Sequence, residues 1–368
     1  MTTLPYTFRQ EILNIKPYVP GKPIDEVKRE LGLTDIIKMA SNENPLGPSP
    51  KAKQAIVEAV EKLHIYPDGY CFELRRAVAE KVQVDDNQLI FGNGSDEIIK
   101  LLAETFLQPG DQVLTGSPSF SEYDYATHLM GGEMVKIPLK NNRFPLEKIA
   151  ESISSKTKLI FICNPNNPTG TCVSAEEVDR FIAQVPDSVV VIFDEAYNEY
   201  VEDENYPDTL KYIKDGKKNV IVLRTFSKIY ALASLRIGYG VASPDLIALV
   251  SRTREPFNVN SMAQFAAVAA LQDREHLELS RKVNSKGKTF LYQAFEDMNL
   301  NYIPTEANFI MVDTGKDSKL LFQKMLRKGV IVRTGDIFGM DTYLRVTIGT
   351  MEQNQRFIKA LKECLEEM

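Results

Sequence analysis

The chain has 368 residues, of which 43% are hydrophobic and 26% charged, and its formal net charge is −6 at pH 7. This composition is typical of a globular protein with about two or three domains of ordinary size, and the negative charge argues against general nucleic-acid binding. No apolar run reaches the roughly 18 residues of a membrane helix, and the N-terminal stretch lacks the apolar core of a signal peptide. We therefore expect a cytoplasmic protein that binds neither nucleic acid nor membrane.

Cysteine and histidine are few and widely spaced. There are four cysteines and three histidines, and no pair of cysteines has the CxxC spacing. A zinc site or a disulfide framework therefore has no support. We expect reduced thiols that pack as small apolar groups and no bound metal.

Residues 1–48 form a proline-rich segment that we expect to wrap over the rest of the chain as an N-terminal arm. An amphipathic pattern over 50–63 predicts a helix. The turn Tyr66-Pro67-Asp68-Gly69 separates it from a second helix whose apolar positions extend to Val82.

Strand and helix patterns alternate from residue 88 to residue 223. We predict strands at 88–91, 112–115, 134–138, 158–163, 188–193 and 219–223. Helices are predicted at 94–107, 121–130 and 146–153, and another begins at the capping box Ser174–Glu177. This alternation predicts an α/β fold with a mainly parallel sheet covered by helices. In such sheets ligands bind at the carboxyl ends of the strands.

After Pro244 the chain becomes mostly helical, and a long polar stretch at 273–298 is predicted to be a linking helix. A smaller mixed unit follows, with predicted strands at 309–312, 330–333 and 343–348 and helices at 320–328 and 353–367. With a boundary near residue 275, the predicted organisation is an arm (1–48) that contributes to the small domain and to a dimer contact, a large domain (49–275) and a small α+β domain (276–368).

The first of four candidate sites is the glycine-rich loop 91–97, which joins a predicted strand to a helix. Backbone amides at such a helix start attract anions, so Gly94, Ser95 and Asp96 are candidates to hold a phosphate. A dinucleotide fingerprint would need a third glycine where this chain has Glu97. The alternative is a structural glycine turn with a capped helix.

Three more polar sites follow predicted strands. The stretch 163–170, Cys-Asn-Pro-Asn-Asn-Pro-Thr-Gly, predicts a rigid corner, although an ordinary turn remains possible. Asp194 ends an apolar run, so burial would require a partner, and its neighbour Glu195 should point to the other side. Lys228 and Arg236 flank an apolar stretch. One interpretation is that Lys228 is an amine nucleophile and Arg236 binds an anion. The alternative is that Lys228 is an ordinary surface lysine and Arg236 an ion-paired arginine.

A lysine, a carboxylate, an arginine, polar ring ligands and a phosphate loop together suit pyridoxal 5′-phosphate. From about Ser41 to the C-terminus, the chain resembles the fold-type I aminotransferases and, within them, the histidinol-phosphate aminotransferases. The resemblance rests on SNENPLGPSP, YPDGYCFELR, FGNGSDEII, NPNNPTG, DEAY, TFSKIYALASLRIGYG, EANF and YLRVTIGT in this order. It implies transamination of L-histidinol phosphate with 2-oxoglutarate, giving imidazole acetol phosphate and L-glutamate, in histidine biosynthesis.

The resemblance also assigns roles to residues by motif. Lys228 would be the Schiff-base lysine and proton carrier, and Asp194 would pair with the pyridinium nitrogen. The remaining cofactor contacts implied are Asn167 and Tyr197 at the ring hydroxyl, Ser227 and Arg236 at the phosphate beside the amides of Ser95 and Asp96, and Tyr123 stacked on the ring. The segment Phe120-Ser121-Glu122 departs from the family pattern, in which tyrosine is common. Tyr66 would reach the cofactor phosphate of a partner subunit, which implies a homodimer with composite active sites.

Substrate recognition depends on Arg345, which matches the arginine that binds a substrate carboxylate, and on Arg333, on a neighbouring predicted strand. A phosphate dianion calls for more than one cation. Tyr18 matches an N-terminal tyrosine that covers the substrate. The alternatives are an aromatic amino-acid aminotransferase, a threonine-phosphate decarboxylase, a non-catalytic pyridoxal-binding regulator and a nicotinamide dehydrogenase.

Overall fold

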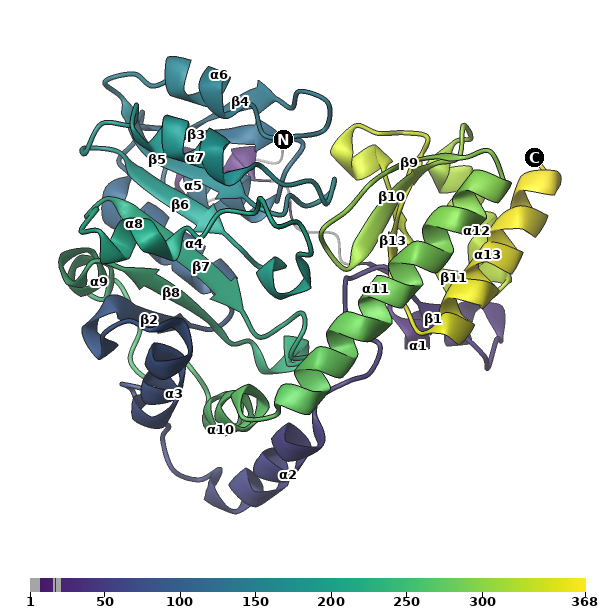
Figure 1. The fold of residues 1–368 in the computed structure, drawn as a ribbon, viewed down its shortest axis with the longest axis horizontal. Coiled ribbons are helices and arrows are strands. Elements are labelled where there is room, and N and C mark those ends of the chain that lie inside the picture. Colours follow the sequence, from purple (N-terminus) through teal and green to yellow (C-terminus); the bar gives the residue numbers. More distant parts are fainter. Residues whose placement is uncertain (1–6, 16, 18–20) are drawn as a thin grey trace.

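Seven strands form the central sheet of the larger part of the molecule (Figure 1). This computed structural model describes residues 7–15, 17 and 21–368. In chain order the seven strands are Leu89–Gly92 (β2), Gln112–Ser117 (β3), Glu133–Pro138 (β4), Thr157–Cys163 (β5), Val190–Asp194 (β6), Val220–Thr225 (β7) and Gly238–Ala242 (β8). Across the sheet their order is β2-β8-β7-β6-β5-β3-β4. The pairs from β7 to β4 are parallel, so the predicted α/β class with a mainly parallel sheet is confirmed.

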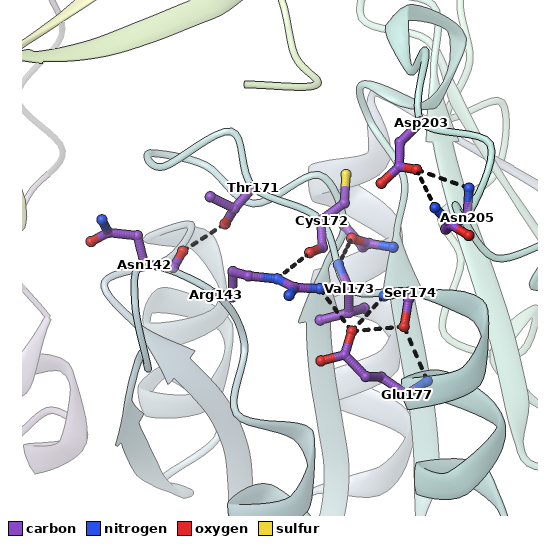
Figure 2. Close-up of polar contacts among 10 residues, drawn as sticks. Asn142, Arg143, Thr171, Cys172, Val173, Ser174, Glu177, Asp203 and Asn205 are labelled. Atoms are coloured by element: carbon purple, nitrogen blue, oxygen red, sulfur yellow. Dashed lines mark hydrogen bonds and ion pairs between the residues drawn. The ribbon is translucent and has the colours of Figure 1, made fainter. Parts of the chain in front are cut away.

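Strands β5, β6 and β7 lie in the centre of the sheet and are buried along almost their whole length. A strand that is covered on both faces carries a continuous apolar run instead of an alternating pattern. The helices that cover the sheet are Ser95–Phe106 (α4), Glu122–Leu129 (α5), Leu146–Glu151 (α6), Ala175–Ile182 (α7), Leu210–Lys214 (α8) and Pro244–Val250 (α9). The predicted capping box at the start of α7 is confirmed, because the side chains of Ser174 and Glu177 each accept a hydrogen bond from the other's backbone N–H (Figure 2).

Strand β8, which overlaps most of the apolar run 235–241, was not expected from the sequence. It is antiparallel to both β2 and β7 and lies between them. A Cβ atom on Gly238 would lie 2.4 Å from the backbone nitrogen of Ser95. The glycine therefore allows the first turn of α4 to pack directly against β8.

Helices outside the sheet include Pro50–Ala59 (α2), Phe72–Val82 (α3) and Ser261–Leu271 (α10). The predicted helix 50–63 ends earlier than expected, because Val60–Lys62 continue as a 3-10 turn. Two of its apolar residues, Val60 and Leu63, are 46% and 57% exposed. The apolar face predicted for this helix is therefore only partly covered by the chain itself.

The smaller part of the molecule is built on a four-stranded antiparallel sheet in the order β12-β13-β10-β9. Its strands are Asn301–Ile303 (β9), Phe309–Asp313 (β10), Arg333–Thr334 (β12) and Tyr343–Thr347 (β13). Its helices are Arg274–Asp297 (α11), Ser318–Arg327 (α12) and Met351–Glu366 (α13). The predicted strand 330–333 is in fact two short strands, since Val330–Ile331 (β11) pairs elsewhere.

The N-terminal segment joins this smaller part. Ile37–Lys38 (β1) pairs in parallel with β11, and Ile24–Leu31 (α1) buries Val27 against Leu326 and Ile331. The linking helix α11 begins beside the boundary proposed near residue 275 and leads from α10 into the smaller part (Figure 1). We keep the division into arm, large domain and small domain as a proposal. In the part of the chain that the structure describes, no helix is long and apolar enough to cross a membrane.

Gly287 sets how closely α11 approaches its neighbours in the smaller part. A Cβ atom there would lie 2.6 Å from Ile348 Cγ2 and 2.8 Å from Asn354 Nδ2. Alanine is the better helix former by about 1 kcal/mol, but overpacking a core costs about 1–3 kcal/mol. We therefore expect Gly287→Ala to lower the free energy of unfolding by about 1–2 kcal/mol in urea titrations. The exposed neighbour Lys286→Ala is the control, and a Gly287→Ala protein as stable as the parent would contradict the packing argument.

Candidate functional site

A cavity of about 200 Å³ opens at the carboxyl ends of β5, β6 and β7 and is closed on its far side by the smaller sheet. Ten residues predicted from the sequence line it: Ser95, Asp96, Asn167, Asp194, Tyr197, Ser227, Lys228, Arg236, Arg333 and Arg345. The strand ends of a parallel sheet meet at one edge, which is why residues far apart in the chain converge here.

Lys228 lies three residues beyond the end of β7, in a turn where the backbone N–H of Ser227 donates to Thr225 Oγ1 at 3.1 Å. Its Nζ atom lies 5.6 Å from the centre of the Tyr197 ring. Burial, assisted by the positive charge of Arg345, lowers the pKa of Lys228 to about 8. A substantial fraction of the amine is therefore neutral slightly above neutral pH, and a neutral amine is the form that attacks a carbonyl carbon.

Asp194 ends β6 and is only 2% exposed. Its carboxylate accepts hydrogen bonds from the Tyr123 hydroxyl at 2.7 Å and from the backbone N–H of Ala196 at 3.3 Å. Burial raises the pKa of Asp194 to about 6 in spite of these bonds. A cationic group placed against this carboxylate would favour its charged form.

Glu195 points away from the cavity, as the alternation of an extended chain predicts. It accepts two hydrogen bonds from Arg224, at 2.8 and 3.0 Å, and another from the Thr209 hydroxyl. Asp194 and Glu195 are therefore not a general acid/base pair.

Tyr123 does not have the position expected for a ring that stacks on a cofactor. It is fully buried, its hydroxyl points to Asp194, and its ring stacks on Phe161 with 4.4 Å between centroids. Of these two neighbouring rings it is Phe120 that lines the cavity, and it packs against Tyr123 in a T-shaped arrangement with 5.6 Å between ring centroids. The prediction for Tyr123 is corrected accordingly: Tyr123 supports Asp194 from behind, and Phe120 offers the ring surface.

The glycine loop and Arg236 form an anion cradle at the start of α4. Gly94 has φ +82°, and a Cβ atom there would lie 2.6 Å from Arg236 Nη2. The guanidinium is oriented by hydrogen bonds from Nη2 to Asp96 Oδ2 at 2.8 Å and from Nη1 to the Ala233 carbonyl at 3.2 Å. No side chain caps the first turn of α4 at this N-cap, so its amides suit an anion in the cavity. This arrangement favours the phosphate interpretation over a capped glycine turn.

The smaller sheet brings two arginines to the opposite wall. Arg333 of β12 and Arg345 of β13 are directly paired in register, and both line the cavity. Arg345 donates to Asn167 Oδ1 at 2.6 Å and to the Ala40 carbonyl at 2.9 Å. Like charges directly opposite each other are unfavourable in a sheet, so this pair is suited to a ligand with high negative charge.

Asn167 is held by a rigid corner. Directly after the corner, hydrogen bonds connect residues 171 and 172 to the turn at Asn142 and Arg143, and Arg143 in turn to α7 (Figure 2). The contacts are Thr171 Oγ1 to the Asn142 carbonyl at 2.6 Å, Arg143 Nε to the Cys172 carbonyl at 2.8 Å and Arg143 Nη2 to Glu177 Oε2 at 2.7 Å. Within the corner, the N–H of Gly170 donates to the Asn166 carbonyl at 2.6 Å and Asn166 Nδ2 donates to Thr169 Oγ1 at 2.9 Å. These bonds fix the turn that carries Asn167.

Besides Tyr123, one predicted residue lies away from this cavity and another lies outside the described residues. Tyr66 is 80% exposed and stacks on Phe257 with 4.9 Å between ring centroids. Tyr18 lies outside the described residues. Conversely, Asn42 and Phe338 line the cavity although we assigned them no role from the sequence. Asn42 belongs to the SNENP motif, but it lies in an irregular segment where no periodic pattern indicates its direction.

Known proteins resemble this chain over nearly its whole length. The family model for aminotransferase class I and II matches residues 34–361. A histidinol-phosphate aminotransferase of Moorella thermoacetica is 58% identical over 97% of this chain and 92% of its own. Another, of Caldicellulosiruptor saccharolyticus, is 53% identical over 97% of this chain and 100% of its own. The crystal structure of histidinol-phosphate aminotransferase from Sinorhizobium meliloti in complex with pyridoxal-5′-phosphate has a TM-score of 0.92 at 25% identity, over 100% of this chain and 99% of that one.

The lowered pKa of Lys228 predicts a pH-dependent effect of replacing it. In cofactor-free protein below about pH 8, the folded state must hold a charged amine where burial disfavours it, whereas the unfolded chain keeps the ordinary pKa of 10.5. We expect Lys228→Met to be more stable than the parent near pH 7. The difference should shrink as pH rises from about 8 to 10.5, because the folded lysine then loses its proton before the unfolded one.

Urea unfolding of both proteins near pH 7 and near pH 10 measures this difference. The exposed Lys286→Met is the matched control and should show a gap that does not depend on pH. A parent that is more stable than Lys228→Met near pH 7, or a gap that stays constant, would show that Lys228 is not poised by burial.

Proposed function

This chain belongs to the class I and II aminotransferases and, among them, to the histidinol-phosphate aminotransferases, and from this premise we propose that it transfers the amino group of L-histidinol phosphate to 2-oxoglutarate. The products are imidazole acetol phosphate and L-glutamate, in histidine biosynthesis. The enzyme depends on pyridoxal 5′-phosphate. The same proposal includes a cytoplasmic location, as expected from the sequence.

The residues of the cavity fit this cofactor. Bound pyridoxal 5′-phosphate supplies an aldehyde for the amine and a ring that withdraws electrons from the substrate carbon. Lys228 is the amine that would hold the aldehyde carbon, and the buried Asp194 would keep a proton on the ring nitrogen, because each charge would compensate the other. The space beside Gly94 and the guanidinium of Arg236 suits the phosphate.

The ring itself is held by the remaining polar and aromatic residues. Asn167 and Tyr197 hold the ring hydroxyl, Ser227 and the amides of Ser95 and Asp96 add to the phosphate site, and Phe120 offers its ring face. The amine of Lys228 would also act as a general base that moves a proton at the substrate carbon. Its pKa of about 8 suits a group that must accept and return a proton near neutral pH.

The observation that carries the substrate assignment is the pairing of Arg333 with Arg345 across β12 and β13. A phosphate dianion offers several oxygens to two planar guanidinium groups, and its two negative charges match the two positive charges of the arginines. A carboxylate of 2-oxoglutarate or glutamate would occupy the same pair in the second half-reaction. Because one site serves both amino donor and acceptor in turn, we expect ping-pong kinetics.

A second candidate activity, on aromatic amino acids, is favoured by the apolar side of the cavity. Phe120 and Phe338 both line it, and imidazole and phenyl rings are similar in shape. Discrimination between these substrates would therefore depend on the phosphate group and not on the ring.

We also propose a homodimer with composite sites. Large apolar side chains that this chain leaves exposed gather around the end of α2 and the start of α3: Val57, Val60, Leu63, Ile65, Tyr66, Tyr70 and Phe72. Exposed apolar patches of this kind mark protein interfaces. Tyr66 lies within the patch, and the proposal gives it a place at the cofactor phosphate of the partner.

Removing the Arg333 side chain tests the substrate assignment. We expect Arg333→Ala to lower kcat/KM for histidinol phosphate by about 10- to 100-fold, because a charge-assisted hydrogen bond is lost. The loss for histidinol, which has no anionic group, should be no more than a few-fold, and the loss for phenylalanine, whose carboxylate carries a single charge, should be smaller than that for histidinol phosphate. Steady-state kinetics on the three substrates measure this, with Lys319→Ala as a control that removes a charge of the small domain outside the cavity. Equal losses on all three substrates would overturn the phosphate assignment.

Mixing two defective variants tests the composite site. Lys228→Ala and Tyr66→Ala should each have low activity alone, since every site lacks one required side chain. After subunit exchange, a mixed dimer has one site that combines an intact Lys228 with an intact Tyr66 from the partner, so activity should return. Each variant carried alone through the same subunit-exchange procedure is the control. Unchanged activity in a mixture proven by mass to contain mixed dimers would exclude a role for Tyr66 across the interface.

A further inference from the structure

Asn42 is a strained and buried residue on the cavity wall. It lies between β1 and α2, is 2% exposed and has φ +57°. A side chain other than glycine is rarely found in this left-handed region, although asparagine tolerates it best. Strain of this kind persists where surrounding contacts hold the residue, and it is concentrated at functional sites.

The hydrogen bonds of Asn42 follow one another from donor to acceptor, and the last of them ends at Tyr197. The backbone N–H of Asn42 donates to Thr347 Oγ1 at 2.9 Å. The Thr347 hydroxyl in turn donates to Asn42 Oδ1 at 3.3 Å, and Asn42 Nδ2 donates to the Tyr197 hydroxyl oxygen at 3.0 Å. Because Thr347 Oγ1 already accepts the backbone N–H, its single hydrogen is available for the amide oxygen, and this bond orients the amide nitrogen toward Tyr197.

The backbone of Asn42 is also fixed from the smaller sheet. Asn308 Nδ2 donates to the Asn42 carbonyl oxygen at 3.0 Å, and both residues are buried. The irregular N-terminal segment is thus tied to the ends of β10 and β13 on one side and to Tyr197, beyond β6, on the other. Such anchoring holds the amide in one orientation.

An amide nitrogen can only donate a hydrogen bond. The Tyr197 oxygen therefore accepts from Asn42 and cannot return its own hydrogen to that group. Tyr197 lines the cavity, so its hydrogen is turned toward the cavity. We propose that Asn42 is a positioning residue that fixes the Tyr197 hydroxyl as a hydrogen-bond donor to the ring oxygen of the bound cofactor. This inference rests on the role of Tyr197 in the proposed function.

A hydrogen bond donated to an anionic oxygen favours the charged form of that oxygen. Loss of the Tyr197 donor concentrates negative charge on the cofactor oxygen, which then binds a proton more tightly. The visible absorption of the bound cofactor changes when this proton is lost, so its pH midpoint reports the donor directly and without turnover.

Asn42→Asp preserves the shape of the side chain but replaces the donor by an acceptor, so the Tyr197 hydroxyl should turn its hydrogen toward the new carboxylate. We expect the spectral midpoint to rise by about one pH unit or more. In a Tyr197→Phe background the same substitution should produce less than half of that shift, because no hydroxyl remains to be redirected. This double-mutant cycle separates the redirected donor from the direct effect of a new negative charge.

Asn42→Gly is the matched control. Glycine accepts φ +57° without strain and removes the donor without offering an acceptor, so Tyr197 can still donate into the cavity. We expect a shift smaller than half of that in Asn42→Asp. If Asn42→Asp does not fold, as judged by urea unfolding of the cofactor-free protein, Thr347→Val takes its place. It frees the amide to rotate and should raise the midpoint in the parent but not in Tyr197→Phe.

Three results would overturn the inference: no shift in Asn42→Asp, an equal shift in both backgrounds, or a shift in Asn42→Gly as large as in Asn42→Asp. With Thr347→Val as the substitute, an unchanged midpoint or an equal shift in both backgrounds would do the same. These outcomes differ from failure of the proposed function. That failure would appear as a parent protein without a visible cofactor band, or with a band that Lys228→Ala leaves unchanged.

Discussion

Two opposite charges at the ends of adjacent parallel strands are the constraint on which the rest of the site depends. Lys228 follows β7 and Asp194 ends β6, and burial moves both groups toward their neutral forms, with pKa values of about 8 and about 6. In the function that we propose, a cofactor that took up the amine as a covalent link and offered a cationic ring nitrogen to the carboxylate would relieve both costs. Such a ligand would account for polar side chains at an otherwise apolar sheet edge.

The smaller sheet completes the site from the other side. Arg345 reaches across to Asn167 and to the carbonyl of Ala40, so it links the small sheet, the asparagine-rich corner and the N-terminal segment. Arg333 pairs with it in register. In the function that we propose, substrate recognition would use the same side chain that joins the two parts of the molecule, and an anion between the arginines would stabilise both.

The sequence indicated Tyr123 as the ring that faces the cavity, whereas in the structure Phe120, three residues earlier, lines it. Both are aromatic and both lie near the start of α5, so the sequence alone does not distinguish the ring that faces the cavity from the ring behind it. Phe120 precedes the helix, whereas Tyr123 lies in its first turn and points into the core against Phe161. The direction of the helix axis relative to the sheet decides which ring is exposed to a ligand.

The sequence by itself determined the α/β class, the strand ends at which Lys228, Asp194 and Asn167 lie, and the family, because buried strands leave continuous apolar runs and the motifs follow them in order. Only the tertiary structure decided that β8 is antiparallel, that Arg333 opposes Arg345, and that Asn42 directs its amide to Tyr197. These are contacts between segments distant in the chain. They depend on strand register and on the direction of side chains in irregular segments, and neither has a periodic signature in the sequence.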